Sequence, residues 1–197
     1  MLISRKAYEY LLGVYLGDGT PYNKTGIKLT VGKADPEYAD LLMSILRPYN
    51  PRMRMEYTKD KSSYYYRIFA CHPELVKYIR KYKSPYSEKS LWSFPNLLFP
   101  EELIAGVFDT DGSTRSRKRA TGKWVFEIVI YQRQSQNLKL LLPYFEKLFL
   151  YPTYRFEKSN NMSTLNLSHI TQAKIFFRQV PIKHPRKRKI ISQVATI

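Results

Sequence analysis

The chain has 197 residues, enough for one good-sized domain or two small ones, and its 44% of hydrophobic residues can supply a folded core. Its 33 Lys and Arg against 16 Asp and Glu leave a net charge of +17, so we expect a polyanionic partner, nucleic acid before an anionic membrane surface. There is no apolar run of membrane-spanning length, no clean signal-peptide pattern and one cysteine, Cys71, which we place in the core, so we predict an intracellular protein that is not secreted.

The first predicted element is an apolar helix that contains the stretch LLGVYLGDGT, residues 11–20, and ends on Asp18 between two glycines. The C-terminal end of a helix carries partial negative charge, so an acid is unfavourable there and a base would be expected. An isolated Asp-Gly pair would be explained by a hairpin turn. The position of Asp18 is therefore informative only if it recurs in the chain.

Between residues 25 and 71 the pattern predicts a strand near 25–32, a helix over 34–46, and a pair of strands at 52–58 and 64–71. In the segment 52–58, Arg52, Arg54, Glu56 and Thr58 alternate with apolar residues, which predicts a half-buried strand with one solvated, basic face. A twisted antiparallel sheet with such a face fits the major groove of DNA.

The segment PYSEKSLWSFPNLLFP, residues 85–100, is predicted to be a connector, because three prolines argue against a continuous helix. Beyond it, IAGVFDTDG repeats the first motif and carries Asp111 where the first copy has Asp18. Predicted strands within 115–132, a helix over 135–149 and strands at 153–158 and 164–169 follow. The chain therefore contains two copies of a unit of roughly 95 residues, a period longer than that of solenoid repeats.

The repeat defines the predicted domain organisation. Residues 1–84 form the N-terminal half, 85–100 the connector, and 101–197 the C-terminal half, which ends in a basic helix. Each half has the order helix, two strands, helix, two strands, helix, so the predicted fold class is α+β with two antiparallel sheets.

Small residues recur on one face of each motif helix, at Gly13 and Gly17 and at Gly106 and Thr110. This spacing lets two helix backbones approach closely, and pseudo-twofold packing would then bring Asp18 and Asp111 together. The resulting repulsion would be removed by a divalent cation, with the carbonyl oxygens of Gly17 and Thr110 as further ligands. A cation held by two acids beside a surface that binds polyanions suits phosphodiester hydrolysis.

The two motifs resemble the signatures of the LAGLIDADG homing endonucleases, in the form that carries both motifs on one chain. The resemblance covers almost the whole chain and implies two αββαββα halves that form a saddle of β-sheets over a long, pseudo-palindromic duplex DNA site. It implies that Asp18 and Asp111 bind Mg²⁺, or Mn²⁺, and each serve the cut of one strand, leaving short 3′ overhangs. It also implies a monomer.

Further roles follow from the resemblance. Gln132 is expected to hold the attacking water, whereas the matching position of the first copy is Gly32. Asp109, which replaces Leu16 of the first copy, is expected to form local hydrogen bonds. The peripheral lysine of the family has no clear match, and His72 and His169 lie roughly where it would be.

The residues predicted to touch DNA are basic or polar strand residues, roughly half of which we expect to contact only phosphate or nothing. They are Lys28, Thr30, Lys33, Arg52, Arg54, Arg115, Arg117, Arg119, Lys123, Arg133, Tyr154, Arg155 and Asn166.

Three functions are compatible with the sequence: a site-specific DNA endonuclease, an RNA-splicing maturase of the same fold that binds intron RNA, and a DNA-binding regulator that has lost catalysis. Asp18 and Asp111 are both present, which favours the endonuclease and is compatible with an additional maturase activity. The small amount of sequence outside the repeat favours an intron-encoded product.

Overall fold

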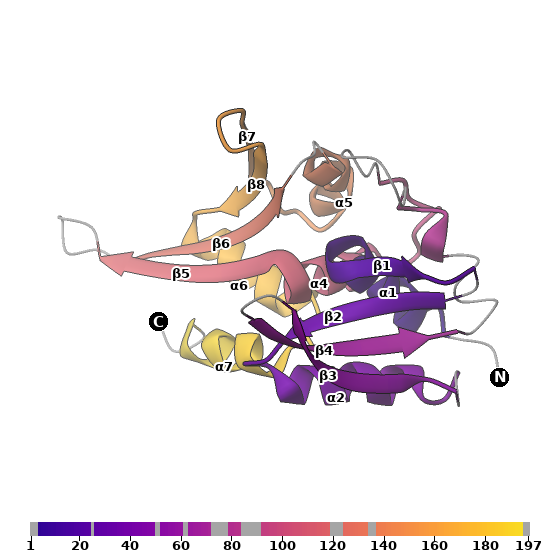
Figure 1. Cartoon of the computed structure of the whole chain (residues 1–197). Helices are drawn as coiled ribbons and strands as arrows, with labels where there is room; N and C mark the ends of the chain where they lie inside the picture. Colours follow the sequence, from indigo (N-terminus) through magenta and orange to yellow (C-terminus); the bar gives the residue numbers. More distant parts are fainter. Residues whose placement is uncertain are drawn as a thin grey trace.

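The computed structural model describes residues 4–24, 26–49, 52–60, 63–71, 79–83, 92–118, 124–133 and 137–194, and for residues 116–118, 124 and 191–194 the backbone alone. The fold class is α+β, as predicted, with two antiparallel four-stranded sheets. The sheets lie on either side of two packed central helices (Figure 1).

The N-terminal half has the strand order β1-β2-β4-β3 in its sheet, with all pairs antiparallel. Its elements are α1 (Arg5–Asp18), β1 (Gly19–Tyr22), β2 (Gly26–Gly32), α2 (Pro36–Leu46), β3 (Arg54–Asp60) and β4 (Ser63–Ala70). The first strand follows the motif helix without a gap, because the residue after Asp18 is already extended.

The C-terminal half repeats this topology with the strand order β5-β6-β8-β7. Its elements are α4 (Pro100–Asp111), β5 (Gly112–Lys118), β6 (Trp124–Arg133), the 3₁₀ helix η1 (Asn137–Leu141), α5 (Leu142–Lys147), β7 (Thr153–Glu157), β8 (Met162–Leu167), α6 (Ile170–Gln179) and α7 (Pro185–Val194). The helix predicted over 135–149 is divided into η1 and α5, with Pro143 at the start of α5. Proline is favoured at a first helical turn because it has no N–H to leave unsatisfied.

The predicted close packing of the motif helices is observed between α1 and α4. A Cβ on Gly13 would collide with the carbonyl oxygen of Leu103 and lie 2.9 Å from the amide nitrogen of Val107. A Cβ on Gly106 would meet Tyr10 and Val14 in the same way, 2.7 Å from the Val14 nitrogen. Glycine is therefore required on both helices, and the pair forms the centre of the hydrophobic core.

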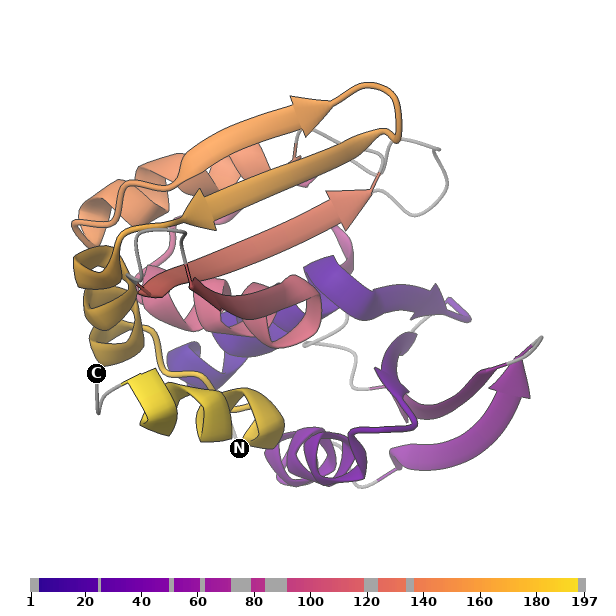
Figure 2. The same ribbon diagram turned by 90° about the vertical axis from the view of Figure 1, so that its left-hand side faces the viewer.

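Each sheet has one face toward the helices and one outward face. In β2, Ile27, Leu29 and Val31 are buried toward the helices, so Lys28 and Thr30 lie on the outward face. In β4, Ile68 and Ala70 are buried. Cys71, the next residue, is exposed, so our prediction that it lies in the core was wrong. Figure 2 shows the two sheets as separate curved layers with α1 and α4 between them.

Pro100, the last residue of the predicted connector, is already the first residue of α4, and Trp92 and Leu97 of the connector are buried. Within the described part of the chain, none of the helices is both long and apolar enough to cross a bilayer.

Candidate active site

Both motif helices end on their aspartate. Asp18 is the last residue of α1 and Asp111 the last of α4, and in each case the next glycine donates its N–H to the carbonyl four residues earlier, Tyr15 or Phe108. Neither helix has a basic residue in its last turn. The acids are therefore placed by the helices at their unfavourable ends, as the repeated motif indicated.

The two helix ends meet. A Cβ on Gly17 would lie 3.1 Å from the Oδ2 atom of Asp111 and would collide with the side chain of Thr110, so the Asp111 carboxylate rests against the last turn of α1. Burial, followed by the negative charge of Asp18, raises the pKa of Asp111 to about 7. Burial also raises the pKa of Asp18, although this residue remains accessible to solvent. The positive charges of Lys83 and Lys187 oppose both shifts.

Lys83 supplies the missing base at the end of α1. Its Nζ donates hydrogen bonds to the carbonyl oxygens of Tyr15, Gly17 and Gly19 at 3.2, 3.1 and 2.8 Å. The Tyr15 carbonyl also accepts the N–H of Gly19, so Lys83 is a second donor there, and its ammonium group places a positive charge at the negative end of the helix.

Lys187, on α7, does the same at the end of α4. Its Nζ donates to the carbonyl oxygens of Phe108, Asp109 and Thr110 at 2.6, 2.8 and 3.4 Å. Burial lowers the pKa of Lys83 and of Lys187 to about 8, opposed in each case by nearby aspartates. Sequence reasoning missed both lysines, although the demand for a base at each helix end indicated that such residues exist.

The donor set suits a hard divalent cation. The Asp18 and Asp111 carboxylates and the carbonyls of Gly17 and Thr110 offer oxygen ligands only, which Mg²⁺ prefers. The two carbonyls accept from Lys83 and Lys187, but a carbonyl oxygen has two lone pairs and can serve a second cation. Among the described residues, no cluster of three or more His, Cys, Asp or Glu could hold a metal, so such a cation would keep several water ligands.

Most of the predicted DNA-contacting residues with described side chains lie on the outward faces of the sheets. Strand pairing and alternation place Lys28, Thr30, Arg54, Arg115, Arg133, Arg155 and Asn166 there. The Arg54 guanidinium lies over the rings of Phe69 and Tyr22, at 4.7 and 5.8 Å, and pairs with Glu56 at 3.0 Å. Arg67, which sequence reasoning missed, lies between Thr30 and Glu56 on the same face and pairs with Asp60.

Two predicted contacts face the other way. The ammonium group of Lys33 lies 6.0 Å from the ring centre of Tyr64, which is on the helix-facing side of β4 with Ile68. Tyr154 packs against the core, because it alternates with the outward Arg155. Arg52 is exposed just before β3, and Arg117 belongs to β5. Arg119, Lys123 and His72 lie outside the described residues.

The strand register changes the interpretation of Gln132. Gly19 pairs with Leu29 and Gly112 with Ile130, so the residue that matches Gln132 in the first half is Val31 and not Gly32. Gln132 lies two residues after the buried Ile130, on the same face of β6, so its side chain is directed toward the helices. The water-orienting role assigned to Gln132 stays a prediction, and this orientation argues against it.

His169 has a structural role. It is the N-cap of α6, and its Nδ1 accepts a hydrogen bond from the N–H of Thr171 at 3.3 Å. Lys83 and Lys187, and not His169, are the basic residues that donate to the carbonyls at the ends of α1 and α4. The active-site role considered for the histidines stays a prediction.

Asp109 forms hydrogen bonds, as predicted, but its partners are not local: they lie 74 to 99 residues away along the chain. Its Oδ2 accepts from the Tyr10 hydroxyl at 2.8 Å and from the N–H groups of Lys183 and His184 at 2.9 and 3.1 Å. Burial raises the pKa of Asp109 to about 6, and these donors oppose the shift.

No protein-family model matches the sequence, and a search of curated proteins finds no match. Solved structures do match over most of the chain. The homing endonuclease I-WcaI bound to its DNA recognition sequence is 16% identical, with a TM-score of 0.69 over 94% of this chain and 85% of that one. The LAGLIDADG homing endonuclease I-GzeII in complex with its DNA target is 10% identical, with a TM-score of 0.67 over 96% and 88%. For I-SmaMI bound to uncleaved DNA with calcium ions, the values are 15%, 0.66, 93% and 88%. The chain therefore has the fold of the single-chain LAGLIDADG homing endonucleases.

Proposed function

We propose that this chain is a site-specific endonuclease that cuts both strands of duplex DNA and depends on Mg²⁺ or Mn²⁺. The observation that carries the proposal is the convergence of two carboxylates, Asp18 and Asp111, with the ammonium groups of Lys83 and Lys187 at the ends of α1 and α4. The fold it shares with endonucleases bound to DNA targets supports the same function.

Asp18 and Asp111 would hold the cation through their carboxylates, with the carbonyl oxygens of Gly17 and Thr110 beside them. Bound there, Mg²⁺ would supply an activated water and stabilise the charge that develops on the phosphate and on the leaving oxygen. Without a cation, the two acids repel each other, which is the reason for the raised pKa of Asp111 beyond burial itself.

The two lysines would assist the reaction on the protein side. Each Nζ places positive charge beside the acids, where the phosphate oxygens gain negative charge in the transition state. Because burial lowers the pKa of both groups to about 8, each Nζ stays mostly protonated at neutral pH yet gives up a proton more readily than a surface lysine. We therefore assign to Nζ of Lys83 and of Lys187 the donation of a proton to the leaving 3′ oxygen, one for each strand.

The outward faces of the two sheets would bind the DNA. Lys28, Arg54, Arg115 and Arg155 lie on these faces, and the net charge of +17 favours the phosphate backbone. Because the halves are similar but not identical, the target would be long and pseudo-palindromic. Cuts on both sides of the minor groove would leave 3′ overhangs, and one chain would supply both half-sites as a monomer encoded by an intron, active wherever the target DNA lies.

The test is cleavage of a plasmid that carries the uninterrupted allele of the gene in which the coding sequence resides. The purified chain should linearise this plasmid with Mg²⁺ or Mn²⁺, leave it intact with EDTA, and leave a plasmid without the allele intact. Sequencing of the ends would give the overhang. Failure to cut the allele with either metal would overturn the proposal, and tight binding without cutting would indicate a regulator.

A further inference from the structure

A carboxylate is buried where the first half has a leucine. Asp109 is 2% exposed, and the equivalent Leu16 is fully buried. A buried carboxylate is unfavourable unless it is hydrogen-bonded, and here one oxygen, Oδ2, accepts three hydrogen bonds. Two of the donors are consecutive backbone N–H groups, of Lys183 and His184, so this carboxylate holds a segment of main chain.

The held segment leads directly into α7, which begins at Pro185 and carries Lys187. The N–H of Arg188 donates to the His184 carbonyl and so joins the held residues to the first turn of the helix. Lys187 then returns to the carbonyl of Asp109 itself, at 2.8 Å. The side chain of Asp109 fixes the start of α7, and α7 delivers the lysine to the end of α4.

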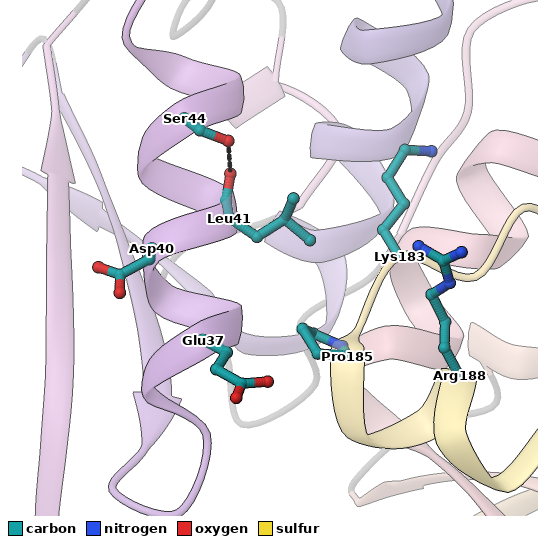
Figure 3. Close-up of a pocket in the computed structure, with 7 residues that line it drawn as sticks. All are labelled: Glu37, Asp40, Leu41, Ser44, Lys183, Pro185 and Arg188. Atoms are coloured by element: carbon teal, nitrogen blue, oxygen red, sulfur yellow. Dashed lines mark hydrogen bonds between the residues drawn. The ribbon is translucent and has the colours of Figure 1, made fainter.

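The same segment also contacts the N-terminal half. The ring of His184 stacks on the ring of Tyr38 with 4.3 Å between the ring centres, and the Tyr38 hydroxyl lies 3.3 Å from the Tyr10 hydroxyl. Within the C-terminal half, Lys183 pairs with Glu102 of α4. Beside these contacts, a groove of about 560 Å³ lies between α2 and the start of α7 (Figure 3): Lys183, Pro185 and Arg188 line one side, and Glu37, Asp40, Leu41 and Ser44 line the other. At the first residues of α2 the two elements do meet, because His184 and Arg186 lie 3.6 and 3.3 Å from the carboxylate of Asp35, the N-cap of α2. Tyr38 and Asp35 contact side chains of this region, whereas Asp109 holds the main chain of the segment through two N–H groups.

Lys83 reaches its site by another route. It forms a β-bridge with Trp92, and the N–H of Ser93 donates to the Tyr82 carbonyl at 3.0 Å. The N–H of Trp92 is held in turn by Asn137 at 3.0 Å. These contacts hold the chain around Lys83 without a carboxylate from α1. The first half therefore needs no acid at the position equivalent to Asp109, and Leu16 occupies it.

We infer that Asp109 is a positioning residue for Lys187. The Asp109 carboxylate, held by the Tyr10 hydroxyl, makes the Lys187 site depend on a buried acid, whereas the Lys83 site has Leu16 at the equivalent position. The consequence for cleavage rests on the proposed function, whereas the consequence for the position of Lys187 does not. One measurement therefore tests the position of Lys187, and a second tests the effect on cleavage.

The first measurement is the reactivity of the lysines toward an amine-acylating reagent, read by peptide mass spectrometry on the full chain. In the parent protein, Lys187 should be protected, since it is 9% exposed. Asp109→Leu, which copies the first half, should raise the labelling rate of Lys187 about tenfold or more, the size expected when hydrogen bonds to a buried charged group are lost. Asp109→Asn, which keeps the size and one acceptor oxygen, should give a smaller rise, and Lys83 should not change in either variant.

Glu9→Gln is the matched control. Glu9 is also a buried acid of a motif helix that accepts from two consecutive N–H groups, of Leu98 and Phe99 at 3.0 and 2.7 Å, but it does not hold α7. It should leave the labelling of Lys187 unchanged. Unchanged protection of Lys187 in folded Asp109→Asn, or in folded Asp109→Leu, would overturn the inference. If the leucine variant does not fold, the asparagine variant decides.

The second measurement is the single-turnover cleavage rate of each strand, with the two strands labelled separately. Asp109→Asn should slow the same strand as Lys187→Met and leave the strand slowed by Lys83→Met within about twofold of the parent rate. Equal slowing of both strands would contradict the assignment to Lys187. If the parent protein cuts no DNA but the Asp109 variants gain Lys187 labelling, the proposed function is overturned and the positioning role of Asp109 stands.

Discussion

The two halves of the molecule build the same arrangement of charges by different routes. At each helix end an aspartate is followed by a strand, and a lysine, half-buried in the first half and buried in the second, donates to three carbonyls at that end. In the N-terminal half the lysine comes from the last residues before the connector, where it forms a β-bridge with Trp92, and in the C-terminal half it comes from α7. The charges at the centre are thus shared between the halves, whereas the chain segments that supply them are not.

The largest effect should come from the shared acids. Asp18→Asn and Asp111→Asn should each abolish double-strand cleavage, by about a thousandfold or more, because either change removes a cation ligand. DNA binding measured by fluorescence anisotropy should be retained. Full double-strand cleavage in either variant would show that the centre does not lie between these acids.

A stability measurement separates this effect from unfolding. The folded-state pKa of Asp111 is about 7, above its ordinary value of 3.8, so stability is lost as the pH rises from about 4 to about 7, and the full penalty is present above pH 7. Asp111→Asn removes the charge and should therefore unfold at an equal or higher temperature than the parent at pH 8. A lower melting temperature would assign the lost activity to damage of the fold.

The next effect concerns the helix contact on which both halves depend. Gly13→Ala and Gly106→Ala should each destabilise the fold by about 3 kcal/mol, because the added Cβ collides with backbone of the other helix and the backbone cannot yield locally. Gly32→Ala is the control, since its Cβ would have Asp35 Oδ2 as nearest neighbour at 4.0 Å. Urea unfolding measures all three. A tolerated alanine at only one of the two positions would show that the contact is not symmetric.

The third effect is a pH dependence of stability that arises at His184, in the segment that leads into α7. Burial, with the charges of Lys187 and Arg186, lowers its pKa to about 4 from an ordinary 6.5, against the opposing charge of Asp35. The unfolded chain therefore takes up a proton below pH 6.5 that the folded chain takes up only near pH 4, so stability is lost as the pH falls through this interval, by about 3 kcal/mol at most.

His184→Phe tests this while keeping the ring over Tyr38 and the backbone N–H to Asp109. Between pH 7 and pH 4.5, the melting temperature of the parent should fall more than that of the variant. Parallel curves for the two proteins would show that His184 does not remain neutral in the folded state.

The sequence predicted the parts of the site that are local. The repeated motif predicted the helix ends, both acids and the glycine contact, because these depend on residues within one helical turn and on their repetition. It did not predict the lysines, because Lys83 lies 66 residues from Gly17 and Lys187 lies 77 residues from Thr110, and no local pattern couples such positions.

Register limited the prediction of the sheet faces. Side chains alternate along a strand, so an error of one residue moves a side chain to the opposite face. Matching Gln132 with Gly32 rather than with Val31 was such an error, and only the pairing of Gly112 with Ile130 corrects it. The alternation around Arg54 correctly placed Arg54 and Glu56 on one face, which pairing with β4 makes the outward face. The predicted half-buried strand was wrong, because Met55 and Tyr57 on the other face of β3 are 37% and 57% exposed.

The smallest effect should distinguish Arg54 from Arg155, two residues that the repeat aligns. Arg155 is exposed on the edge strand β7, whereas Arg54 already pairs with Glu56 and with the Tyr22 hydroxyl at 3.1 Å. If Arg155 contacts one phosphate, Arg155→Ala should reduce the slope of log K against log salt by about 0.9. Arg54→Ala should reduce it less, because Glu56 offsets the charge that DNA would otherwise attract. Anisotropy titrations of a duplex at several salt concentrations measure both slopes. Equal reductions would mean that Arg54 leaves Glu56 when DNA binds, and that the halves differ in the free protein but contact the phosphates alike.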